Sequence, residues 1–183
     1  PNVHRLTGAG QQMARTFDAL LSAPEAPLFI SVTTESTAIV SSLLKARADP
    51  NVKARNGATP LFAAAKLGLA GMVDMLIAAG ADVNHTAQRG GATSLIVAAS
   101  EGHVDVVDIL LEARAEVDVF QEDGTGALFW AASKGHVAVV EALLDAGTNT
   151  AKTSVTGMTA HDAAVLGGHQ RVADLLSKRG HTN

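Results

Sequence analysis

The feature that most constrains this chain is a repeat of 33 or 34 residues that runs through most of its length. Leu28, Leu61, Leu95 and Leu128 head similar segments, and His161 takes the same place in a fifth. Three further rows keep the same register: Leu43, Leu76, Leu110, Leu143 and Leu176; Gly68, Gly102, Gly135 and Gly168; and Gly57, Gly91, Gly124 and Gly157. A repeat of this length is one supersecondary unit that is stable only when neighbours stack on it, so the sequence predicts a solenoid.

The second unit indicates what each repeat contains. Thr59 is suited to cap a helix because its side-chain oxygen can accept a backbone N–H, and the proline after it fits the first helical turn. We expect a short alanine-rich helix from Leu61 to Lys66, ended by Gly68. The apolar residues from Met72 to Ile77 then form one stripe of a second helix.

Composition excludes several classes of protein. The 183 residues are 47% hydrophobic but only 3% aromatic, so alanine and aliphatic side chains must build the core. Because there is no cysteine, a disulfide scaffold, a thiol nucleophile and a cysteine zinc site are ruled out. The net charge of −4 argues against a nucleic-acid binder, which should be basic. No apolar run approaches the roughly 18 residues that a membrane span needs, so we expect no membrane partner.

Several motifs of the repeat closely resemble ankyrin repeats. They are Thr59-Pro60-Leu61-Phe62-Ala63-Ala64 in the second unit, Gly102-His103-Val104-Asp105-Val106-Val107 in the third, and Gly80-Ala81-Asp82-Val83-Asn84 between them. The resemblance covers roughly Ala23 to Gly180, about five units. It implies an all-α ankyrin-repeat solenoid of stacked helix-turn-helix units with hairpin loops. Inner helices and hairpins would form a concave face, and outer helices would form the back.

The chain departs from the ankyrin pattern at a few positions. The first unit has Glu35 and Arg47 where glycines are expected, and the last unit has His161 at the buried leucine position. Such irregular ends are typical of terminal repeats, which cap the core with a more polar surface. The one extra residue of the series falls between Asn84 and Gly91, in an expected loop. In this family a histidine usually follows the leucine of the first helix. Here that position holds Phe29, Phe62, Ile96 and Phe129, and Asp162 in the last unit. We therefore expect that the histidine's hydrogen bond between repeats is lost and that apolar packing replaces it.

We divide the chain into three segments. Residues 1–22 precede the repeats, and a helical stripe of apolar residues there predicts a capping helix from Gly10 to Ser22. The alternative is a partner-binding segment that folds on contact. Residues 23–180 form the repeat domain, and residues 181–183 are a tail.

Chemistry on this scaffold is not expected. His103, His136 and His169 recur once per repeat, but equivalent positions in stacked repeats lie about 8–10 Å apart, whereas zinc ligands lie about 2 Å from the metal. The chain has no nucleophile elbow, glycine-rich phosphate loop or paired histidine-glutamate helix motif. We therefore expect no enzyme activity, no metal and no cofactor.

The resemblance also suggests a modification. Ankyrin-repeat asparagines in the loop after the second helix are known targets of an asparaginyl hydroxylase, and Asn84 and Asn51 lie there. Asn84 follows Asp82 by two residues, as Asn51 follows Asp49. The favoured alternative is that both side chains hold the loop through hydrogen bonds to the backbone.

Partners of ankyrin repeats usually contact hairpin tips and inner helices. Phe120 and Trp130 are the expected anchors because aromatic residues are enriched in binding hot spots. We place Phe120 at a hairpin tip, whereas Trp130 could equally fill a partly buried place on its inner helix. The full set of candidate partner-binding residues is Lys53, Arg55, Lys66, Arg89, Glu101, Phe120, Glu122, Asp123, Trp130 and Lys134.

Charge is unevenly distributed along the chain. Five basic residues and one acid lie between Lys45 and Lys66, whereas eight acids and one arginine lie between Glu101 and Asp123. A complementary partner would be acidic near the first two repeats and basic near the third and fourth. Such a gradient orients a partner and speeds encounter more than it tightens binding.

These observations predict a non-enzymatic, monomeric module that binds a protein partner across its concave face in the cytoplasm or nucleus. One alternative is a regulatory or targeting domain of a larger enzyme or channel. Another is a hydroxylase substrate modified at Asn84 or Asn51. Nucleic-acid binding through the basic segment from Lys45 to Lys66 is a third, which the net charge opposes.

Overall fold

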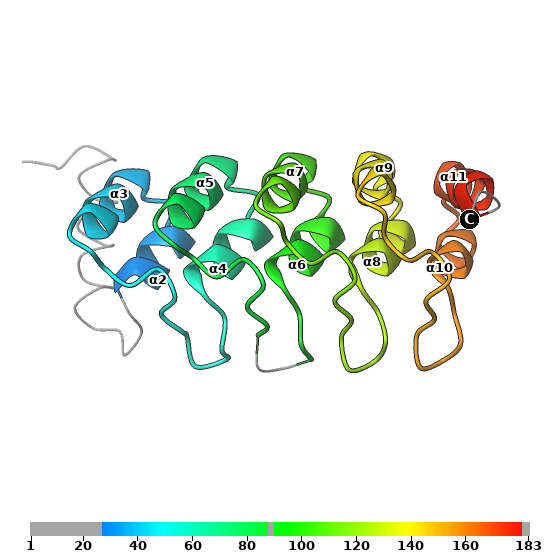
Figure 1. The fold of residues 1–183 in the computed structure, drawn as a ribbon, viewed down its shortest axis with the longest axis horizontal. Coiled ribbons are helices and arrows are strands. Elements are labelled where there is room, and N and C mark those ends of the chain that lie inside the picture. Colours follow the sequence, from blue (N-terminus) through cyan, green and yellow to red (C-terminus); the bar gives the residue numbers. More distant parts are fainter. Residues whose placement is uncertain (1–26, 88–89, 181–183) are drawn as a thin grey trace, which may run out of the picture.

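A computed structural model describes residues 27–87 and 90–180 of the chain. Within these residues the regular secondary structure is α-helical, apart from one isolated β-bridge. Figure 1 shows the helices in two parallel rows, with hairpin loops projecting from one of them. The inner row, next to the hairpins, is α2 (Pro27–Thr33), α4 (Pro60–Lys66), α6 (Ser94–Glu101), α8 (Ala127–Lys134) and α10 (Ala160–Leu166). The outer row is α3 (Thr37–Lys45), α5 (Ala70–Ala78), α7 (Val104–Glu112), α9 (Val137–Asp145) and α11 (Gln170–Gly180).

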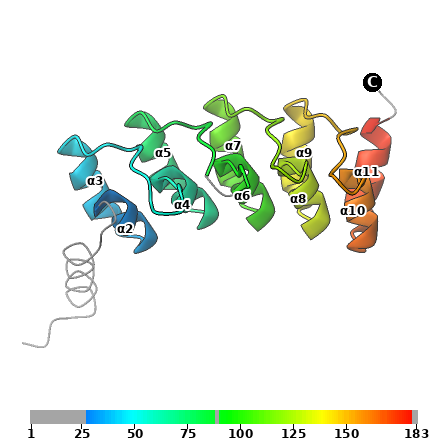
Figure 2. The ribbon, with the colours of Figure 1, turned by 90° about the horizontal axis from the view of Figure 1, so that it is seen from below.

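Each helix packs on its equivalent in the next repeat. Inner helices contact inner helices along the whole series, and outer helices contact outer helices (Figures 1 and 2). The two rows and the hairpins together give each repeat an L-shaped section. The all-α solenoid of five helix pairs that the repeat predicts is therefore confirmed for the described residues.

Threonine caps begin three of the inner helices. The Thr59 side chain accepts a hydrogen bond from the N–H of Phe62, and Thr93 does the same for Ile96. Thr159 and Asp162 form a reciprocal capping box at the start of α10. These bonds satisfy backbone donors that a helix leaves free in its first turn. The cap expected at Thr59 is confirmed.

The core runs as one continuous strip between the two rows. Leu76, Leu110 and Leu143 on the outer helices have no exposed surface, and Leu61 and Leu95 on the inner helices are equally buried. Between inner helices the contacts are made by alanines, which let the helix backbones approach closely and explain how an aromatic-poor chain fills its interior: Ala64, Ala65, Ala98, Ala99, Ala131 and Ala132.

A glycine and a histidine link three successive pairs of repeats. His103 Nε2 lies 3.1 Å from the Lys66 carbonyl oxygen, and His136 repeats the bond to Ser100 at 3.0 Å. His169 makes it to Ser133 at 3.1 Å. The histidine ring packs over the glycine that ends the preceding inner helix, so that a Cβ on Gly102 would lie 2.7 Å from the His136 ring. We call this the glycine–histidine contact; it explains why this glycine and this histidine recur together in successive repeats.

The first interface is built differently. Glu35 stands at the glycine position and Leu69 at the histidine position, so both members of the contact change together. Glu35 and Arg47, the residues found in place of expected glycines, both adopt left-handed backbone, with φ of 55° and 62°. Arg114, at the place of Gly80 and Gly147, is a third such residue, with φ of 63°. The backbone of the repeat is thus kept even where the glycine is lost.

The extra residue of the series enlarges one hairpin. Most hairpins close between residues four apart, as in Gln121 N–H to the Thr125 carbonyl at 2.8 Å, whereas Ala87 donates to Ala92, five residues on, at 2.9 Å. Neighbouring hairpins are also bonded, since Glu122 N–H donates to the Gly90 carbonyl at 3.2 Å. The expected loop insertion is confirmed, and the hairpins form a connected row.

The last repeat exposes apolar residues. Val165 is 53% exposed at the position of the buried Ala132, and Leu166 is 76% exposed. The side chain of His161 is 43% exposed at the position of a buried leucine. The capping helix predicted over 10–22, the repeat boundary at residue 23 and the tail 181–183 lie outside the described residues. In the described part, every helix is too short to cross a membrane.

Candidate functional site

An apolar groove of about 190 Å³ opens between the inner helices of the second, third and fourth repeats. Its walls come from α4, α6, α8 and the hairpins between them, which the stacking of equivalent positions brings side by side. The lining residues are Phe62, Ala92, Ile96, Val97, Ser100, Gln121 and Trp130.

Trp130 forms the fourth-repeat wall of this groove. It is partly buried, and its Nε1–H donates a hydrogen bond to Gln121 Oε1 at 2.7 Å. Its ring meets Phe129 edge-on, with centroids 6.1 Å apart and planes at 83°. The indole therefore has a fixed orientation and keeps one side on the groove, so it packs against the core and lines the groove at once.

The predicted position of Phe120 at a hairpin tip is wrong. It pairs with Gly126 in a β-bridge at the base of the hairpin, while Glu122 and Asp123 form the tip. The Lys152 ammonium lies 4.8 Å from the centre of the Phe120 ring, within the range of a cation–π interaction. Phe120 is partly buried because the hairpin strand turns its side chain toward the next repeat.

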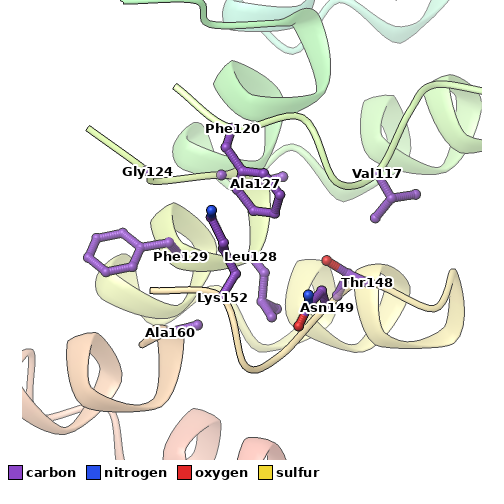
Figure 3. A pocket seen from close by; sticks show the side chains of 11 residues that line it. Val117, Phe120, Gly124, Ala127, Leu128, Phe129, Thr148, Asn149, Lys152 and Ala160 are labelled. Carbon is purple, nitrogen blue, oxygen red and sulfur yellow. The ribbon is translucent and has the colours of Figure 1, made fainter. Parts of the chain in front are cut away.

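The cavity beside Phe120 is too small to hold a ligand. Figure 3 shows Lys152 and Phe120 over it, with Val117 and Phe129 among its walls. Its volume is about 10 Å³, close to the least that holds one water molecule. Phe120 thus contributes packing between the fourth and fifth repeats. The larger groove beside Trp130 is the better candidate for a partner-binding site.

The candidate charges lie on the repeats at the two ends of the groove. Lys53, Arg55 and Lys66 are exposed, and none forms an ion pair within the described part of the chain. Lys66 follows Phe62 by one helical turn on α4. At the other end Glu122 directly follows Gln121 and is exposed. Arg89 lies outside the described residues.

Asp123 also has a structural role. Its Oδ1 accepts hydrogen bonds from the Thr125 hydroxyl at 2.6 Å and the Thr125 N–H at 2.9 Å. These bonds lower the pKa of Asp123 below its ordinary value of 3.8, and the bond from the Thr125 hydroxyl has the larger effect. The carboxylate is therefore charged at neutral pH and holds the hairpin turn while remaining exposed.

Glu101 and Lys134 are brought together rather than left free for a partner. Lys134 Nζ lies 3.7 Å from Glu101 Oε1, and the two side chains are 42% and 41% exposed. Such an exposed pair stabilises the fold little. It does mean that a partner would have to compete with an existing contact, so these two are weaker candidates than Lys66 and Glu122.

Asn51 and Asn84 connect the loops of successive repeats. Asn51 Oδ1 accepts a hydrogen bond from Asp82 N–H at 2.7 Å, and Asn84 Oδ1 accepts one from Glu116 N–H at 2.8 Å. Asp118, at the next equivalent position, accepts from Asn149 N–H at 3.0 Å. The acceptor role can therefore be filled by an aspartate. Asn51 also donates through Nδ2 to the Gly80 carbonyl at 3.0 Å, which an aspartate could not do.

Residues that were not predicted as binding residues include Phe62, Val97 and Gln121 in the lining of the groove, and Lys152 beside Phe120. Phe62 and Val97 lie on inner helices, and inner-helix periodicity could have found them once the facing direction was known. Gln121 and Lys152 matter through contacts with Trp130 and Phe120 that depend on side-chain placement. No spacing in the sequence indicates those contacts.

A comparison with protein families gives one match over most of the chain. The family model for "Ankyrin repeats (3 copies)" matches residues 28–121 and 95–183. These matches run from the second residue of α2 through α11 and include the groove. A comparison with curated proteins gives no match.

Proposed function

Because the chain belongs to the ankyrin-repeat family, whose members are generally protein-interaction modules, we propose that it binds a segment of a protein partner across its concave face. The observation that carries this proposal is the groove walled by Trp130. Its apolar lining lies at the centre of the inner-helix row and is flanked by exposed charges of opposite sign. Central apolar pockets with aromatic walls are where binding energy concentrates in protein interfaces.

We propose that the protein acts without covalent chemistry, as is typical of this family. The three recurrent histidines, which could suggest a metal site, each contact a backbone carbonyl of the preceding repeat. We further propose that the protein acts as a monomer in the cytoplasm or nucleus.

The test is affinity capture from native lysate with two variants side by side. Trp130→Ala with Glu122→Lys should lose most of the captured partner, because the pair removes the groove wall and reverses an end charge. Asp108→Lys on the outer face of α7 is the matched control for surface charge and should capture as the wild type does. Equal capture by all three proteins, with helicity unchanged by circular dichroism, would reject this surface as the binding site.

The alternatives make different predictions. If the chain is a regulatory or targeting domain of a larger enzyme or channel, the same surface would bind a segment of that larger protein. If it is a hydroxylase substrate, Asn84 or Asn51 should gain one oxygen in mass; both side chains bridge loops in the unmodified form. A salt-dependent gel shift with DNA, lost on Lys53→Glu, would favour nucleic-acid binding instead.

A further inference from the structure

We propose that the groove takes an extended peptide segment in which one apolar residue stands between an acidic and a basic residue, with about six residues from charge to charge. This inference rests on the proposed function and makes its partner specific. The acidic residue would lie at the second repeat and the basic residue at the fourth. The argument uses the groove, the charges at its two ends and the repeat spacing.

The middle of the groove suits an uncharged apolar side chain. Ile96 is buried at 3% exposure, and Phe62, Val97 and Trp130 are partly buried around it. Ser100 and Gln121 are the polar residues of the lining, and the Gln121 side-chain oxygen already accepts the indole N–H. A charged side chain placed here would be desolvated without a partner, which is costly.

The repeats at the two ends of the groove carry opposite charges. Lys66 lies one helical turn from Phe62, and Lys53 and Arg55 lie on the hairpin that precedes α4. At the other end, Glu122 and Asp123 form the hairpin tip that follows Gln121. The Glu101–Lys134 pair between them neutralises itself at 3.7 Å. A partner therefore meets positive charge at one end and negative charge at the other.

The spacing of the two ends sets the length of the segment. They belong to the second and fourth repeats, and packed helices lie about 8–10 Å apart, so the ends are separated by about 20 Å. An extended chain advances about 3.3 Å per residue, which makes this about six residues. The apolar residue then falls near the middle, about three residues from each charge.

The test uses synthetic peptides and the full chain. The peptides are Glu-Ser-Ser-Leu-Ser-Ser-Arg and its reversed order, both with blocked ends, because the geometry does not set the direction of the peptide chain. Trp130 is the only tryptophan, so its fluorescence reports binding at the groove, and calorimetry gives the affinity. At least one order should bind about tenfold more tightly than the same peptide with serine in place of leucine.

Charge reversal checks the orientation of the segment. Lys66→Glu should weaken the better peptide about threefold, and replacing the peptide's glutamate by lysine should restore binding to that variant. Lys53→Glu should behave in the same direction, while Asp108→Lys on the outer face should change nothing. Lys66 and Lys53 are exposed, so these variants are expected to fold.

The proposal is overturned if neither peptide binds better than its serine control, or if charge reversal and its swap leave affinity unchanged. The proposed function is tested separately. If native partners depend on Trp130 and Glu122 but the peptides fail, only the segment chemistry is wrong. If native capture is also independent of those residues, the surface itself is wrong.

Discussion

Three non-glycine residues occupy left-handed backbone: Glu35, Arg47 and Arg114. A residue with a Cβ pays roughly 1–2 kcal/mol in this region, because the side chain crowds the following carbonyl. Equivalent positions in other repeats carry glycines with the same backbone, among them Gly80 and Gly147. The repeat fold therefore imposes the conformation, and these residues adopt it at a local cost.

Arg114→Gly should stabilise the protein by about 0.5–1 kcal/mol. The substitution removes the left-handed strain, and the greater freedom of glycine in the unfolded chain offsets part of the gain. Urea unfolding measures the change. Gly147→Ala is the matched control: it has φ of 83° and open space around its would-be Cβ, so it should lose about 1 kcal/mol from backbone strain alone. If both variants destabilise the protein, strain does not govern this position.

The capping box at α10 makes stability depend on pH in the acid range. The Thr159 N–H and hydroxyl donate to Asp162 at 2.9 and 2.7 Å and lower the pKa of that carboxyl below its ordinary value of 3.8. A carboxyl with a lowered pKa in the folded state stabilises it above the ordinary value, and this is lost as pH falls through the folded-state value.

Asp162→Asn should therefore be less stable than the wild type at neutral pH. The difference in stability should stay constant down to about one pH unit above the ordinary pKa of 3.8 and shrink at lower pH. Thermal unfolding across the acid range measures the gap. A gap that stays the same into strong acid would show that the charge of Asp162 contributes nothing to the cap.

Single residues also show how far sequence could predict the surface. Trp130 was placed on an inner helix facing either a partner or the core, and the structure shows it doing both because Gln121 holds the indole across the groove. The prediction of Phe120 at the hairpin tip is wrong, since Phe120 pairs with Gly126 at the base of the hairpin and contacts Lys152 of the next one. Repeat position predicts backbone well, whereas side-chain pairs between hairpin and helix require coordinates.

Among elements, the glycine–histidine contact joins successive repeats. The recurring glycine and histidine could be predicted from the sequence, and so could the short helices, because all follow the repeat period. The contact between glycine and histidine could not be predicted, because the two residues that meet belong to different repeats. At Gly102 the contact is tight, with the His136 ring 2.7 Å from a would-be Cβ, whereas Gly168 has nothing within 4 Å.

Gly102→Ala should cost clearly more than Gly168→Ala. Both pay about 1 kcal/mol for left-handed alanine, with φ of 82° and 74°, but only Gly102→Ala also displaces a packed ring, which typically costs a further 1–3 kcal/mol. Adding His136→Leu should recover part of the Gly102→Ala loss, since leucine stands at the histidine position, as Leu69, at the first interface, where the glycine is also replaced. Equal losses in the two single variants, measured by urea unfolding, would mean that the ring moves aside freely.

At the scale of the whole molecule, the main packing of each described repeat is on its neighbours along the series. Stability is then close to a sum of repeat and interface contributions, so an end repeat has one stabilising neighbour and a central repeat has two. The groove lies over the second to fourth repeats, away from the exposed last repeat with its Val165 and Leu166. The binding surface is thus built on the best-supported part of the described series.

This arrangement predicts that equal damage at the end and at the centre has different reach. Leu176→Ala in α11 and Leu110→Ala in α7 each remove a buried side chain, at a cost of about 2–5 kcal/mol. In Leu176→Ala the last repeat should unfold first, so helicity falls at lower urea while the Trp130 fluorescence transition stays near its wild-type midpoint. In Leu110→Ala both signals should shift together, because the third repeat directly supports the fourth. If Leu176→Ala moves the Trp130 transition as far as Leu110→Ala does, the series unfolds as one cooperative unit and its repeats are not energetically separable.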